Sequence, residues 1–359
     1  MGTSSGSGSW QQKGCSEQVK KAGDMKKLVS ILAGGLLAFQ VAAALAAPRI
    51  HVLILDGESA APYHNWKAET PVLKAELDET GLFDTEVLTA PPAGGDFTQF
   101  HPEWSTYQVV VFNYDAPDDR WSSEVKDSFE RYMKNGGGLV TVHAADNAFP
   151  KWQAFNEMIG IGGWRGRTEA AGPYWHYKDS KLVSDETPGR AGNHGLRIPY
   201  QVVVRDATNP IMKGLPKMWM HQGDELYSKL RGPGKMTVLA TAYSDPANHG
   251  TGFDEPQLMV SQFGKGRVFH TTLGHDVVAL SSVDSVVTFQ RGVEWAATGK
   301  VTQPVPASFP TANSVSYRTD IAAKDPNYGK GLNPLDPAPA PRSGIPAAGG
   351  PPQPNAPLK

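Results

Sequence analysis

The chain of 359 residues contains one cysteine, Cys15, which lies ahead of the region with the pattern of a folded domain. A single cysteine cannot form an intramolecular disulfide. The domain also has no thiol that could act as a nucleophile or as a metal ligand. Disulfide-stabilised folds and thiol-dependent reactions are therefore excluded.

The sequence also lacks an imbalance of charge. It has 34 basic and 36 acidic residues, without the basic run typical of nucleic-acid binding and without an acidic tail. We therefore expect no nucleic-acid partner. The sequence contains nine tryptophans and eleven tyrosines, so many aromatic rings are present. Such rings can stack on sugars, although tryptophan more often fills a core.

Only one long apolar run suggests targeting. Residues 25–46 begin with Met25 and two lysines, continue with an apolar stretch and end in an A-x-A pattern before Ala47. This three-part pattern is typical of a secretory signal peptide; a transmembrane anchor is the alternative, but the run is short for a span. We predict a periplasmic or secreted protein with no membrane partner after cleavage, Met25 as the natural start, and residues 1–24 as a misassigned or vector-derived extension.

Residues 47–305 alternate between short apolar segments and amphipathic ones, which predicts one α/β domain with a mostly parallel central sheet and helices on both faces. Strands are predicted at residues 50–55, 84–88, 109–112, 139–142, 201–205, 218–221, 237–243, 257–263 and 267–272. Helices are predicted from Thr70 and at residues 122–133, 149–158 and 283–298. Residues 161–200 lack periodicity and are predicted to be a long loop insertion, a lid or binding loop. Residues 306–359 are rich in Pro, Ala and Gly and are predicted to be a disordered tail.

Histidines follow the ends of two predicted strands. His143 comes directly after the strand at 139–142, three residues before Asp146, and His275 and Asp276 follow the strand at 267–272. In open α/β sheets, ligands bind just beyond the carboxyl ends of the strands. We therefore expect these side chains to gather on one rim of the sheet.

A further acidic and imidazole group lies at His221, Asp224 and Glu225. A His/Asp/Glu cluster serves either general acid–base catalysis or a divalent metal ion. None of the spacings is a recognised zinc motif, so the sequence establishes no cofactor and leaves a divalent metal as an open option. The alternative for each histidine is a hydrogen bond to the backbone, which applies above all to His176 and His194 in the insertion.

Four segments, taken in order, resemble the ThuA-like, trehalose-utilisation family. They are HNWK at residues 64–67, GGGLVTVHAADNAF at 136–149, WMHQGDELY at 219–227 and GRVFHTTLGHD at 266–276. The resemblance runs from about Arg49 to Val305. It implies a class I glutamine amidotransferase-like fold, a flavodoxin-like three-layer sandwich, which agrees with the predicted sheet.

The chain departs from the amidotransferase pattern at the position of the nucleophile. Amidotransferases carry a cysteine at the elbow after a central strand, whereas this chain has His143 there. Glutamine hydrolysis through a thioester is therefore excluded. His270 or His275 would correspond to the partner histidine of those enzymes. The family resemblance implies a role in disaccharide or keto-sugar metabolism.

We predict an exported enzyme that acts on a small-molecule carbohydrate, a glycoside or its 3-keto derivative, by isomerisation, elimination or hydrolysis. Oxidation at C3 acidifies the neighbouring C–H bond, and histidine is a suitable base. The predicted catalytic residues are His143, Asp146 as its orienting partner, His221, Glu225 and His275. The predicted substrate-binding residues are His64, Trp66, Trp164, Trp175, Tyr177, Asp224 and Asp276. Two alternatives stay open: a non-catalytic sugar-binding or accessory module, and a metal-dependent hydrolase, which needs three ligands about 2.0–2.2 Å from one ion.

Overall fold

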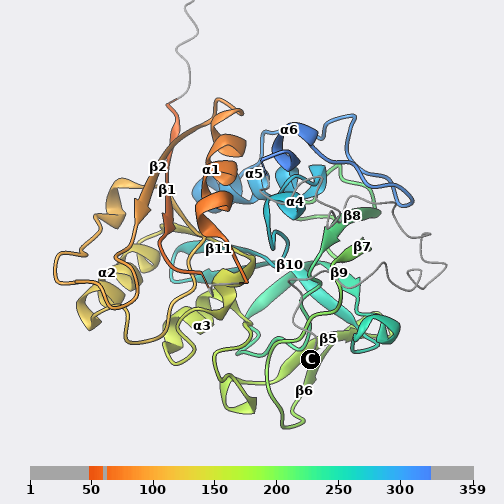
Figure 1. Ribbon diagram of the computed structural model, residues 1–359, viewed down its shortest axis with the longest axis horizontal. Helices are drawn as coiled ribbons and strands as arrows, with labels where there is room; N and C mark the ends of the chain where they lie inside the picture. Colours follow the sequence, from red (N-terminus) through yellow and green to blue (C-terminus); the bar gives the residue numbers. More distant parts are fainter. Residues whose placement is uncertain (1–47, 60–62, 325–359) are drawn as a thin grey trace, which may run out of the picture. The chain divides into compact units, whose positions relative to one another are not determined.

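The computed structural model describes residues 48–59 and 63–324 (Figure 1). The predicted extension at 1–24, the predicted signal peptide at 25–46 and the part of the predicted tail from residue 325 lie outside the described residues. Within the described ranges, no helix combines the length and the apolar character needed to cross a membrane.

A mixed sheet of eleven strands forms the centre of the domain, and its first half is parallel. The order of this half is β2 (Phe83–Thr89), β1 (Ile50–Asp56), β3 (Val109–Phe112), β4 (Gly138–Val142) and β11 (Gly266–Thr271). The inner strands β3 and β4 are buried at every position. Burial on both faces is typical of parallel strands covered by helices.

The second half of the sheet is antiparallel. It continues from β11 through β10 (Asp254–Phe263), β9 (Met236–Tyr243), β7 (Ile198–Val204) and β8 (Met218–Asp224). The prediction of a mostly parallel sheet is therefore wrong. Only two residues join β10 to β11, and a parallel pair would need a crossover of a dozen or more. The fold is α/β, but this mixed topology does not confirm the flavodoxin-like assignment.

Helices cover both faces of the parallel half (Figure 1). One face carries α1 (Trp66–Asp78), α4 (Val277–Leu280) and α5 (Val283–Thr298), and the other carries α2 (Ser123–Lys134) and α3 (Gln153–Ile159). Alternate residues of β1 divide between the two cores: Val52 and Ile54 face the first, Leu53 and Leu55 the second. The period of two along a strand produces this division. Helix α1 begins four residues before the predicted Thr70, with Pro71 inside it.

The predicted loop insertion at 161–200 contains a β-hairpin, so its description as a loop is wrong. Strands β5 (Tyr174–Lys178) and β6 (Lys181–Asp185) pair in antiparallel register, and β5 also pairs with β10. The connecting Asp179 and Ser180 both have positive φ, at 50° and 62°. Two consecutive residues with positive φ are typical of a two-residue hairpin turn, a signal that the sequence prediction missed.

The domain also extends past the predicted boundary at residue 305. Phe309 packs edge-on against Trp219, with ring centroids 5.3 Å apart, and the Met220 amide donates to the Thr311 carbonyl at 2.8 Å. The short helix α6 (Thr319–Ala322) buries Ile321 in the core. Residues 306–324 therefore belong to the folded domain.

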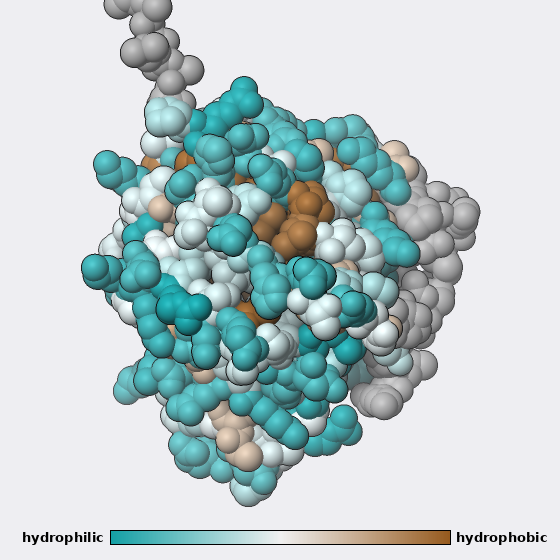
Figure 2. Space-filling view, turned by 90° about the vertical axis from the view of Figure 1, so that its left-hand side faces the viewer, coloured by the Kyte–Doolittle hydropathy of each residue, from teal (hydrophilic) through white to brown (hydrophobic). Residues whose placement is uncertain are grey.

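The face drawn in Figure 2 is mostly hydrophilic, with small hydrophobic areas between polar side chains. Among the described residues, the exposed large hydrophobic side chains are Tyr63 and Val87. Most of the apolar side chains of the domain are thus used in its two main cores.

Candidate active site

His143 lies at a sharp turn after the central strand β4. Its φ is +45°, and it begins the short 3-10 turn His143–Asn147. A left-handed conformation is costly for a residue other than glycine and is often found at functional sites. The Nδ1–H of His143 donates to the Thr272 carbonyl at 2.6 Å, which leaves Nε2 as the free nitrogen. The side chain is 2% exposed.

Three other residues meet His143 at this rim, and together they are called here the His3Glu cluster. His64 comes from the loop between β1 and α1, Glu225 follows β8, and His275 follows β11. Each side chain offers one potential ligand atom, and these atoms all lie within 4.8 Å of one another. Glu225 Oε2 lies 3.2 Å from His275 Nδ1 and 3.8 Å from His143 Nε2. The cluster therefore has the residue types and the size of a site for one metal ion.

Four buried atoms of the His3Glu cluster have no hydrogen-bond partner: His64 Nδ1, His143 Nε2, His275 Nδ1 and Glu225 Oε1. The other carboxylate oxygen, Oε2, is the one nearest His275 and His143. A buried polar atom left unpaired costs about 1–3 kcal/mol, so four at one point are a substantial penalty. A bound cation would relieve this penalty. Three imidazoles and one carboxylate suit zinc and other borderline divalent ions.

The charge states of the cluster also favour a cation. Burial, together with His275 and His143, holds the pKa of His64 well below its usual value, and burial lowers the pKa of His275. Burial raises the pKa of Glu225, but His275 and His143 outweigh it and hold this pKa well below the usual range. Burial likewise opposes the charge on His143, yet Glu225 and Asp224 raise its pKa. Neutral imidazoles and an ionised carboxylate are the forms that bind metals, so an ion would compete with protonation of His143.

A cavity of about 1350 Å³ reaches the His3Glu cluster. His64, Glu225 and His194 line it, whereas His143 and His275 are not among the lining residues. The structure thus places His143 as a group that approaches the cluster from the protein interior. A general base must reach the proton that it removes, so this placement suits a ligand better than a base.

Two of the four predicted aromatic residues line the cavity. Trp66 and Trp164 do, while Trp175 and Tyr177 do not. The latter two lie on strand β5 rather than on a loop. The Trp175 indole donates to the Gly232 carbonyl at 3.0 Å, and the Tyr177 ring lies under the Arg205 guanidinium. The structure therefore does not bring these two predicted substrate-binding residues to the cavity.

His221 is not part of the His3Glu cluster but of a second buried group, the paired group of His221, Asp224 and Asp284. His221 Nδ1 lies 2.8 Å from Asp284 Oδ2, and Nε2 lies 3.0 Å from Asp224 Oδ2. Burial lowers the pKa of His221, but Asp284 and Asp224 outweigh it and raise this pKa to about 10. The imidazole is thus a buried cation between two carboxylates. It has no nitrogen left for catalysis.

Asp224 acts on the site through the backbone. Its carboxylate accepts from the amides of Gly274 at 2.8 Å and His275 at 3.1 Å. Burial raises the pKa of Asp224, but His221, His143 and the Gly274 amide outweigh it and lower this pKa to about 2. Asp224 was predicted to bind substrate. The structure places it instead as the group that fixes the loop carrying His275.

Two predicted acidic residues lie away from the His3Glu cluster. The ion-pair partner of Asp146 is His270, with Nε2 and Oδ2 3.5 Å apart. The Thr272 carbonyl, rather than Asp146, orients His143. Asp276 pairs with Arg197 and caps α4 by accepting from the Ala279 amide at 2.9 Å. Neither has the role that the sequence predicted.

Sequence reasoning missed two residues at this rim, Glu69 and Asp115. Glu69 is buried and accepts from the Asn65 amide at 2.8 Å, which holds the chain next to His64; burial raises its pKa to about 7. Asp115 follows strand β3 and pairs with Arg165. The signal for Asp115 was available, because it follows a predicted strand just as His143 does.

The chain is similar to several known proteins. The family model ThuA, described as trehalose utilisation, matches residues 51–296. A putative ThuA-like protein from Parabacteroides merdae is 43% identical, with a TM-score of 0.73 over 76% of this chain and 99% of that chain. A second, from Bacteroides uniformis, is 21% identical, with a TM-score of 0.48 over 72% and 94% of the two chains. None of the curated proteins compared with the chain matches it.

Proposed function

Since this chain belongs to the ThuA family of trehalose utilisation, we propose that it acts on a carbohydrate and that its His3Glu cluster holds a divalent metal ion. One observation carries the proposal: four side chains, each with a buried polar atom that has no hydrogen-bond partner, offer ligand atoms that lie within 4.8 Å of one another beside a large cavity. A bound ion would supply Lewis-acid polarisation of a substrate oxygen.

His194 is the residue that we assign to proton transfer. It lines the cavity, and its Nδ1–H donates to the Gly195 carbonyl at 2.8 Å, which leaves Nε2 as the nitrogen with a lone pair. Nδ1 also lies 3.7 Å from Glu225 Oε1, so the imidazolium that forms on proton uptake faces a carboxylate. An imidazole can accept and return a proton near neutral pH.

The reaction that fits best is elimination from a 3-keto-glycoside. His194 takes the proton from C2, because the neighbouring carbonyl acidifies that bond. The electron pair forms the C1–C2 double bond as the glycosidic C1–O bond breaks. The proton then returns from His194 to the departing oxygen, so the protein ends in its starting state. Isomerisation would begin with the same proton transfer, whereas hydrolysis would use His194 to activate water.

Metal analysis and turnover together test this proposal. Protein purified without chelators should contain about one divalent ion per chain, and Glu225→Gln should lose it. His194→Ala should keep the ion but lose about 10²–10⁴-fold in turnover of a 3-keto-glycoside. His51→Ala, an exposed histidine on β1, is the matched control and should change neither quantity.

The outcomes separate the alternatives. Wild-type protein without a stoichiometric ion would refute the metal site. A metal-containing protein that binds sugars but turns over neither glycosides nor 3-keto-glycosides would be a binding module rather than an enzyme.

Export of the protein is a second part of the proposal. It is supported by the signal-peptide pattern at residues 25–46. We expect the mature chain to begin at Ala47, which N-terminal sequencing of periplasmic or secreted material would detect. A cytoplasmic protein that retains Met25 would contradict it.

A further inference from the structure

His64 is held less directly by the sheet than the other members of the His3Glu cluster. It lies in the loop between β1, which ends at Asp56, and α1, which begins at Trp66, whereas the other three lie closer to strand ends. Its ring meets those of His143 and His275, with centroids 5.1 and 4.9 Å away. Since loops are more mobile than strands, the orientation of this ring depends more on the contacts of its side chain.

The two nitrogens of His64 have different surroundings. Nδ1 is buried without a hydrogen-bond partner, and Nε2 lies 3.4 Å from the Tyr227 hydroxyl, at the long end of the hydrogen-bond range. An imidazole that binds an ion through one nitrogen carries its proton on the other, and the partner of that proton fixes the tautomer and the ring orientation. With Nδ1 as the ligand atom, Nε2–H donates to the Tyr227 oxygen. His143 has the equivalent arrangement, with Nδ1–H bound to the Thr272 carbonyl and Nε2 free.

Tyr227 is itself held by two rings. Its ring centroid lies 4.0 Å from that of His143 and 4.4 Å from that of Trp164, and the residue is 1% exposed. Its carbonyl accepts from the Gln257 side chain at 3.0 Å. A ring packed in this way has little freedom to move its hydroxyl group away from His64.

The segment that carries Trp164 is strained and is held by two arginines. Trp164 and Arg165 both have positive φ, at 45° and 43°. Two consecutive non-glycine residues in this conformation are costly, so other contacts must hold them there. Arg165 pairs with Asp115, and the buried Arg167 guanidinium donates to the Gly163 carbonyl at 2.7 Å.

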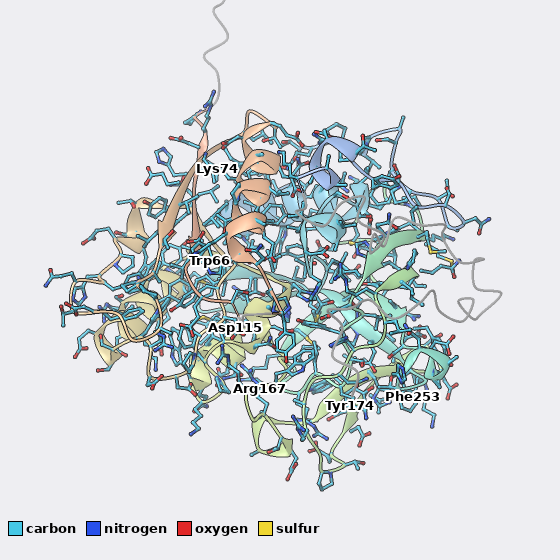
Figure 3. The ribbon with its side chains drawn as sticks, in the orientation of Figure 1. Trp66, Lys74, Asp115, Arg167, Tyr174 and Phe253 are labelled. Carbon is cyan, nitrogen blue, oxygen red and sulfur yellow. The ribbon has the colours of Figure 1, made fainter. Side chains whose placement is uncertain are left out.

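Arg167 also connects this segment to the turn that begins with His143. Its guanidinium donates to the carbonyl of Asn147, the last residue of that turn, at 2.8 Å. In Figure 3, Arg167 lies just below Asp115, and the two charges attract each other. The segment that carries Trp164 is therefore fixed to the turn that carries one of the cluster histidines.

We propose that Tyr227 is a positioning residue for the metal ion: its hydroxyl oxygen accepts a hydrogen bond from His64 Nε2–H and thereby directs Nδ1 at the ion. This inference rests on the metal site of the proposed function. It adds that the affinity for the ion depends on a side chain that offers no ligand atom.

Titration of the metal-free protein with Zn²⁺, in competition with a chromophoric chelator, tests the assignment. Tyr227→Phe removes the hydroxyl group and keeps the ring that packs on His143 and Trp164. We expect the Kd for Zn²⁺ to rise about 10- to 100-fold, the usual effect of removing the partner of a ligand histidine. Tyr200→Phe is the matched control, because it removes another buried phenol hydroxyl, one without a hydrogen-bond partner. Its Kd should equal that of the wild type.

A double variant shows whether Tyr227 acts through His64. His64→Ala removes the ligand itself, so its Kd should rise at least as much as that of Tyr227→Phe. Once His64 is absent, Tyr227→Phe should change the Kd no further, so the effects of the two substitutions should not add.

The results separate this inference from the proposed function. If the wild type binds Zn²⁺ and Tyr227→Phe binds it equally well, with or without a lower melting temperature, the inference is overturned and the metal site stands. The same holds if the effects of the two substitutions add. A wild type that binds neither Zn²⁺ nor Co²⁺ would overturn the metal site, and the inference with it.

Discussion

Two buried groups of histidines and carboxylates contain consecutive residues of the chain, because Asp224 belongs to the paired group and Glu225 to the His3Glu cluster. The two groups differ in whether their polar atoms have hydrogen-bond partners. In the paired group, both nitrogens of His221 face carboxylates, and Asp284 Oδ2 also accepts from the Trp219 indole at 2.8 Å. In the His3Glu cluster, each of the four side chains has one buried polar atom without a hydrogen-bond partner. The residue types and the burial are alike in the two groups.

This difference separates a structural role from a binding role. A buried charge whose neighbours satisfy every atom needs no ligand, and removing one member leaves the others uncompensated. Buried atoms that converge without partners carry a penalty that a ligand can relieve. The two groups should therefore respond in opposite ways to substitution.

The largest expected effect is on the His3Glu cluster. His143→Ala removes one ligand, so we expect the bound ion to be lost and turnover to fall by about 10²–10⁴-fold. The free energy of unfolding of the metal-free protein should fall by only about 1–2 kcal/mol, because the substitution leaves one buried neutral partner, the Thr272 carbonyl, without the Nδ1–H donor. Elemental analysis, kinetics and urea unfolding measure the three quantities. Retained activity together with retained metal would instead assign His143 a structural role.

The paired group should show the reverse. His221→Ala leaves Asp224 and Asp284 buried without their cation, which should lower the free energy of unfolding by about 3–5 kcal/mol. Urea unfolding against His51→Ala as the control would measure this loss. If His221→Ala instead lost turnover at unchanged stability, the distinction between the two groups would be wrong.

Truncation offers a third way to separate the groups. Residues 306–324 pack on Trp219, the neighbour of the paired group, and bury Phe309 and Ile321. Ending the chain at Val305 should therefore lower the free energy of unfolding by about 2–4 kcal/mol, whereas ending it at Lys324 should change it little. Metal content of the folded fraction should be equal in both. Equal melting temperatures of the two truncated chains would show that this segment does not stabilise the domain.

The smallest effect concerns pH. The folded-state pKa of His221 is raised to about 10 from an ordinary 6.5, so its stabilisation is complete below pH 6.5 and is lost as the pH rises towards 10. The difference in unfolding free energy between the wild type and His221→Gln should thus shrink between pH 6.5 and 10. A difference that stays constant over this range would mean that His221 is not a buried cation.

From the sequence we could predict the site residues that directly follow strands of the parallel half of the sheet. His143 and His275 follow β4 and β11, which are neighbours in the sheet, so the rule for parallel strands placed them together. The same rule could not show that His64 belongs to the His3Glu cluster and that His221 belongs to the paired group. His64 comes from a loop, and His221 lies within an antiparallel strand. The pairing of each nitrogen depends on contacts with distant residues such as Asp284 and Thr272, and no local pattern encodes these.

The antiparallel half of the sheet was missed for a similar reason. Apolar runs of strand length look alike in parallel and antiparallel sheets, and only the connections distinguish them. The two-residue link before Gly266 and the Asp179-Ser180 turn carried this information. Trp175 and Tyr177 were misplaced because the hairpin that contains them was not predicted.

The wide spacing of the His3Glu residues along the chain has a consequence for unfolding. Roughly 50 to 80 residues separate each member from the next, so an ion held by all four would close three long loops at one point. In secreted domains, disulfides commonly restrict the unfolded chain in this way, and this domain has no cysteine with which to form one. Occupancy of the cluster would thus tie four distant parts of the folded chain together, and a chelator would remove this stabilisation without breaking a covalent bond.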